Sequence, residues 1–69
     1  MNVITTLVNV KTICEAYGAK LNFAKANLPI ICILPTTNGE VVRCFADELY
    51  NTLGLWCEVN GQEVTFTLS

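Results

Sequence analysis

Apolar residues between positions 39 and 53 recur at the spacing of one helix face. They follow one another at i, i+3, i+4, i+7, i+8 and i+11, namely Val42, Phe45, Ala46, Leu49, Tyr50 and Leu53. This spacing predicts an amphipathic helix from about Gly39 to Leu53. Thr37 and Glu40 fit a capping box at its start, and Gly54 fits the left-handed residue that ends a helix.

Two alternating segments, 55–59 and 62–68, flank Asn60-Gly61, the strongest short-range signal for a hairpin. With these two residues as the turn, the expected pairs on one face are Val59 with Gln62, Cys57 with Val64, and Leu55 with Phe66. On the other face, the expected pairs are Trp56 with Thr65 and Glu58 with Glu63.

The N-terminal half supports two interpretations. Apolar residues at alternating steps of four and three predict a helix that Asn2 caps and Gly18 ends, and they are Val3, Leu7, Val10, Cys14 and Tyr17. However, eight of the eleven residues from 3 to 13 are β-branched, which favours a strand. The alternative is therefore a strand over 3–8 and a short helix from Val10 to Tyr17. We prefer the continuous helix, because its stripe is regular and the second half of the chain has the same pattern. Segments 20–24 and 28–34 are expected to form a second hairpin.

The order helix, hairpin, helix, hairpin predicts one α+β domain over residues 1–69. We expect a two-layer αββαββ fold with a four-stranded, mostly antiparallel sheet and both helices on one face. The halves, about 2–35 and 37–69, are weakly similar in pattern. The sheet residues expected to face the helices are Leu21, Phe23, Ile30, Cys32, Leu34, Leu55, Cys57, Val64 and Phe66.

The sequence also predicts an apolar patch on the opposite face of this sheet. Alternation along the strands places Ile31, Ile33 and Trp56 there, beside Thr65 and several charged residues. Such a patch commonly marks an interface, and tryptophan is enriched among residues that dominate binding. We expect these four residues to contact a second copy of the chain or a different protein. The alternative is that they are scattered exposed apolar residues.

Composition and charge exclude several other partners. The longest apolar run, Leu28 to Leu34, is far shorter than the about 20 residues of a membrane span. The four basic residues are scattered and the net charge is −2, so we expect no nucleic-acid partner. The N-terminus shows no secretory signal, which indicates a cytoplasmic protein.

The side chains offer little catalytic chemistry. The chain has no histidine, and its four cysteines, Cys14, Cys32, Cys44 and Cys57, form no Cys-x-x-Cys motif. We therefore expect reduced structural thiols and no catalytic, cofactor-binding or metal-binding residues. Cys44, beside Arg43, is the best candidate for a reactive thiol, but it has no general base nearby in the sequence.

These patterns predict a small non-catalytic protein-binding module that forms a homodimer. A class of function that fits is an inhibitor or adaptor of the mobile-element or phage type, which docks on a larger host protein complex. The alternative is a small-ligand or metal-binding module, or an enzyme whose site forms across a dimer interface. In that case the polar residues available to line a pocket are Asn22, Glu58, Glu63 and Thr65.

Overall fold

The computed structural model describes residues 3–22 and 29–67. Its elements are α1 (Val3–Tyr17), β1 (Lys20–Asn22), β2 (Ile30–Ile33), α2 (Gly39–Leu53), β3 (Cys57–Asn60) and β4 (Glu63–Phe66). This order confirms the predicted αββαββ fold class. The alternative of a strand over 3–8 is wrong, because those residues begin a continuous helix. The expected cap Asn2 and core residue Phe23 lie outside the described residues.

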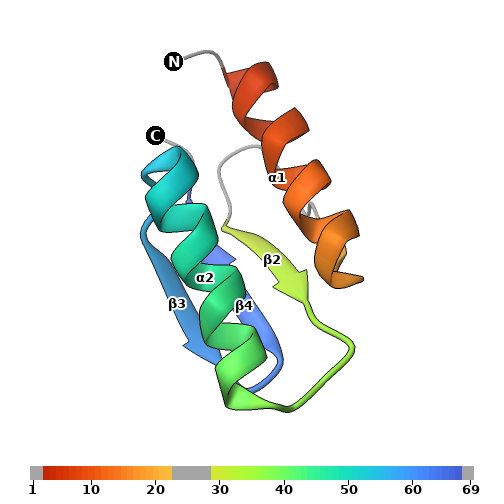
Figure 1. Ribbon diagram of the computed structural model, residues 1–69. Coiled ribbons are helices and arrows are strands. Elements are labelled where there is room, and N and C mark those ends of the chain that lie inside the picture. The colour runs from red at the N-terminus through yellow and green to blue at the C-terminus, as the bar shows by residue number, and fades with distance from the viewer. Residues whose placement is uncertain (1–2, 23–28, 68–69) are drawn as a thin grey trace.

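The strands form one antiparallel sheet in the order β1-β2-β4-β3. Both helices cover the same face of this sheet (Figure 1). Burial follows the alternation of the strands: Cys32 and Val64 on the helix side are fully buried, whereas Ile31 and Thr65 on the other side are only partly covered. The two layers thus enclose one apolar core.

α1 is helical despite its many β-branched residues. Its buried side chains are Thr6, Val10, Ile13 and Cys14, which share one face of the helix. A β-branched residue lowers helix propensity by only a few tenths of a kcal/mol, and burial of one such side chain contributes about 1.5–3 kcal/mol. Packing therefore outweighs the strand preference. The predicted stripe is slightly misplaced, since Leu7 and Tyr17 are half-buried.

The C-terminal hairpin has a different register from the predicted one. Cys57 pairs with Phe66 and Asn60 with Glu63, so each partner is shifted by two residues. Gly61 has φ 61° and no non-glycine residue in the described part has positive φ, which suits a turn with glycine alone at its first position. A shift of two leaves every side chain on its predicted face, but it places Glu58 opposite Thr65 and not opposite Glu63.

Gln62 ties this turn to the central strand. Its backbone carbonyl accepts a hydrogen bond from the Leu34 N–H at 2.9 Å, and its side-chain Nε2 donates to the Leu34 carbonyl at 3.0 Å. These two bonds continue the pairing of β2 with β4 by one residue. They explain why Gln62 belongs to the turn and does not pair with Val59.

The N-cap of α2 is Asn38 and not the predicted Thr37. The Asn38 Oδ1 accepts a hydrogen bond from the Glu40 N–H at 2.9 Å, and the Asn38 N–H donates to the Thr36 Oγ1 at 3.1 Å. The third helical position after this cap is Val41, so the reciprocal half of a capping box is missing. Asparagine caps helices as well as threonine does, and it stands directly before the first helical residue.

We expect Asn38→Ala to lower the free energy of unfolding by about 1 kcal/mol, because it removes the acceptor for a free helix amide. Thr37→Ala is the matched control and should change stability by less than about 0.5 kcal/mol. Urea unfolding followed by circular dichroism measures both. An equal loss in the two variants would show that the cap is assigned to the wrong residue.

Candidate functional site

Three of the four predicted interface residues lie together on the outer sheet face. Ile31 and Ile33 are half-buried on the central strand β2, and Thr65 on β4 pairs with Ile31. The polar residues around them are exposed, and they are Lys20, Asn22, Glu58 and Glu63. Both helices lie on the other side of the sheet (Figure 1), so within the described residues no helix covers this small apolar centre.

Trp56 is not part of this group. It precedes β3, and its ring lies 4.8 Å from the ring of Tyr50 on α2, centroid to centroid. A side chain on the outer face could not make this contact, since packed layers lie roughly 10 Å apart. Trp56 is 79% exposed and Tyr50 is 45% exposed. The apolar spacing placed Tyr50 on the same helix face as the core residues Phe45 and Leu49, but its side chain is exposed, and the two rings form a separate exposed pair beside β3.

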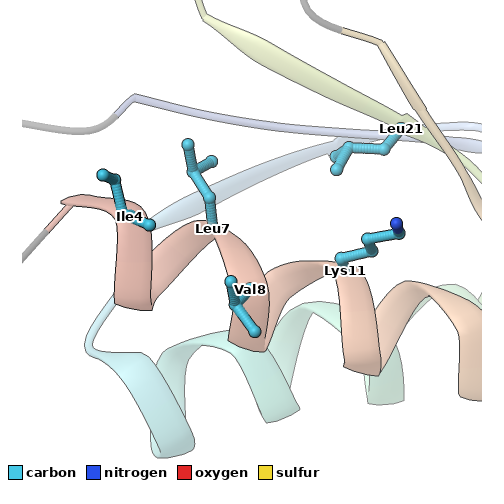
Figure 2. Close-up of a pocket in the computed structure, with 5 residues that line it drawn as sticks. All are labelled: Ile4, Leu7, Val8, Lys11 and Leu21. Atoms are coloured by element: carbon cyan, nitrogen blue, oxygen red, sulfur yellow. The ribbon is translucent and has the colours of Figure 1, made fainter.

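A second apolar surface lies along α1. A groove of about 210 Å³ runs between this helix and β1, and its lining residues are Ile4, Leu7, Val8, Lys11 and Leu21 (Figure 2). Ile4 is 70% exposed and Val8, one helical turn later, is 58% exposed. Among the described residues that line the groove, Lys11 is the one that carries a charge. The groove is thus an open apolar trench with one ammonium group beside it.

The sequence contains a signal for this surface, but the many β-branched residues of the segment made the signal hard to recognise. The buried face of α1 accounts for Val10, Ile13 and Cys14, yet Ile4 and Val8 are also apolar and lie outside that face. A helix with apolar residues beyond its core face usually packs against a further surface. The excess of β-branched residues favoured only the alternative of a strand, whereas Ile4 and Val8 among them form a second apolar side of the helix.

All four thiols are free, and two of them lie close together. The Cys14 and Cys32 Sγ atoms are 3.8 Å apart in the core, Cys57 is half-buried, and Cys44 is exposed. The hydrogen bond with Cys14, together with burial, raises the pKa of Cys32, whereas the same bond lowers the pKa of Cys14. Burial raises the pKa of Cys57 to about 11, which makes its thiol a poor nucleophile at neutral pH.

The described residues hold no group of three or more His, Cys, Asp or Glu side chains that could bind a metal ion. In residues 3–22 and 29–67, neither helix is both long and apolar enough to cross a membrane. Comparison of the chain with known protein families, with curated proteins and with solved structures finds no match. The candidate site therefore rests on the two apolar surfaces, one along α1 and one on the outer sheet face.

Proposed function

We propose that this chain is a small non-catalytic protein-binding module of the cytoplasm, which self-associates through the exposed side of α1. The observation that carries the proposal is the pair Ile4 and Val8, which stand one turn apart beside the groove formed with Leu7 and Leu21. Large exposed apolar side chains that are contiguous with a groove are typical of interaction surfaces. The free thiols fit a reducing compartment.

A second copy of the chain suits this groove. In a symmetric dimer, the same face of α1 serves both partners, so Ile4 and Val8 of each copy can fill the groove of the other. An antiparallel helix pair centred between these residues separates the two Lys11 positions by about 15 Å along the helix axis. The charges then do not oppose each other. A 69-residue domain also buries only about 60% of its unfolded surface, which makes oligomerisation a common source of stability.

The outer sheet face would remain free for a different partner. It lies on the side of the molecule away from the helices, and it has the anatomy of an interface core, with Ile31 and Ile33 inside a polar rim. A dimer through α1 would present two copies of this face. That arrangement supports an inhibitor or adaptor, of the mobile-element or phage type, that docks on a larger host protein complex.

We expect the wild-type protein to sediment as a dimer in the micromolar range and the double variant Ile4→Glu, Val8→Glu as a monomer. Loss of two buried apolar contacts should weaken dimerisation by at least about 100-fold. Glutamate is a good helix former and both positions are exposed, so the fold should persist in circular dichroism. Sedimentation equilibrium over a dilution series measures the affinity.

The matched control is Trp56→Glu with Val59→Glu, which adds the same two charges at exposed apolar positions beside or on β3. It should remain a dimer. A second double variant, Ile31→Lys with Ile33→Lys, tests the outer sheet face. If that variant dissociates while the α1 variant remains dimeric, self-association uses the sheet. A wild-type protein that is monomeric at every concentration refutes self-association altogether.

A further inference from the structure

A pair of cysteines joins the two layers of the core. Cys14 lies on α1 and is 2% exposed, and Cys32 lies on the central strand β2 and is 0% exposed. Their Sγ atoms are 3.8 Å apart. The sulfur atoms of a disulfide are about 2.05 Å apart, so bond formation needs an approach of about 1.8 Å between the two sulfur atoms.

We propose that Cys14 and Cys32 form a reversible disulfide site that links α1 covalently to β2. This inference goes beyond protein binding and does not depend on it. Neither remaining thiol has a sulfur partner among the described residues: Cys44 is exposed on α2, and the half-buried Cys57 donates to the Leu55 carbonyl at 3.5 Å. The structure thus singles out one pair of the six that four cysteines allow.

The oxidant is a low-molecular-weight disulfide such as glutathione disulfide. The Cys14 thiolate attacks one of its sulfur atoms, which breaks the glutathione S–S bond and releases one glutathione thiolate that takes up the Cys14 proton. The Cys32 thiol then loses its proton and displaces the second glutathione from Cys14. One protein S–S bond replaces one glutathione S–S bond, and the two protons and two electrons end on two glutathione molecules.

The order of attack follows from the environment of the two thiols. In the closed structure the Cys14 thiol donates a hydrogen bond to the Cys32 sulfur. When Cys14 ionises, the Cys32 thiol donates to the Cys14 thiolate instead, which lowers the pKa of Cys14, while this bond and burial raise the pKa of Cys32. Both are inaccessible in the closed structure, so attack requires α1 to separate from the sheet. A helix that is held by side-chain packing can open locally at less cost than global unfolding. Oxidation should therefore be slow and should accelerate in urea below the unfolding midpoint.

Tryptic mapping identifies the bond without ambiguity. Cleavage after Lys11, Lys20, Lys25 and Arg43 places Cys14 in peptide 12–20, Cys32 in peptide 26–43, and both other cysteines in peptide 44–69. The protein is equilibrated in buffers of reduced and oxidised glutathione, free thiols are blocked with N-ethylmaleimide, and the digest is analysed by mass spectrometry. We expect peptides 12–20 and 26–43 to be linked, and the oxidised protein to show a higher urea midpoint, because the bond restricts the unfolded chain.

The variant Cys44→Ser, Cys57→Ser keeps only the proposed pair and should oxidise with the same midpoint potential as the wild type. The same variant in high urea is the unfolded reference, and folding should favour the bond by at least about tenfold. A protein whose Cys14 and Cys32 stay reduced in glutathione disulfide, at low urea as well as without it, overturns the proposal. So does an oxidised form linked through Cys44 or Cys57, or a bond that the folded chain forms no more readily than the unfolded one.

Discussion

Replacing Val64 by asparagine is expected to unfold most of the protein, whereas the same replacement at the neighbouring Thr65 should leave it folded. Val64 is fully buried between the sheet and the helices. Val64→Asn loses about 1.5–3 kcal/mol of apolar burial and buries an amide without partners at a further cost of about 1–3 kcal/mol. A domain of 69 residues has a total stability of roughly 3 to 10 kcal/mol. The expected loss of stability in Val64→Asn is thus comparable with the total free energy of unfolding.

The control at Thr65 tests the sidedness of the sheet directly. Thr65 is half-buried on the outer face, opposite Ile31 and Glu58, where water can hydrate an amide. Both variants place the same residue at neighbouring positions of the same strand, so they differ mainly in the face of the sheet that receives the amide. Urea unfolding of both variants measures the difference. Equal losses of stability would mean that the helices do not cover the face that carries Val64.

Phe45→Ala is expected to cost about 3–5 kcal/mol, the second largest loss. Phe45 is fully buried, and its ring packs edge-on against Tyr17 of α1, with the centroids 5.3 Å apart. Removal of the ring leaves a cavity where α2 meets α1. It therefore weakens the contact between the helices as well as burial in the core.

Tyr50→Ala is the matched control for this variant, because it removes an exposed aromatic ring from the same helix. Among the aromatic pairs of the described residues, its ring contacts only Trp56, which is even more exposed. We expect a loss below about 1.5 kcal/mol. Thermal unfolding followed by circular dichroism ranks the two variants. A larger loss at Tyr50 than at Phe45 would contradict the assignment of the core.

Hydrophobic periodicity predicts those features of the fold that depend on one segment of the chain alone. The bounds of α2 follow from its apolar spacing and from Gly54, which adopts φ 69° as its C-cap. The four-stranded sheet follows from two hairpins with helices between them. The faces of β4 follow from strict alternation, and they are correct even though the hairpin register is displaced by two residues.

The features that could not be predicted from the sequence depend on contacts between segments that are distant in the chain. The hairpin register is set partly by the bonds of Gln62 to Leu34, 28 residues away. The position of Trp56 depends on the ring of Tyr50, and alternation along a strand does not apply to a residue before the strand begins. The exposed side of α1 becomes visible only once its buried side is known. Of the two candidate surfaces, the apolar centre of the outer sheet face, Ile31 and Ile33, could be predicted from the sequence, and the groove along α1 could not.

The order of the strands also determines how the two halves of the chain can be separated. The central strands β2 and β4 come from different halves and pair from Ile30–Phe66 to Ile33–Glu63. Each half, cut from the other between Leu34 and Asn38, would expose an unpaired strand where the sheet centre had been. Two chains can instead exchange halves, with every hydrogen bond of the sheet reproduced across the pair. The conformation of the short connection between β2 and α2, residues 34–38, then determines whether one chain forms the whole sheet or two chains exchange halves.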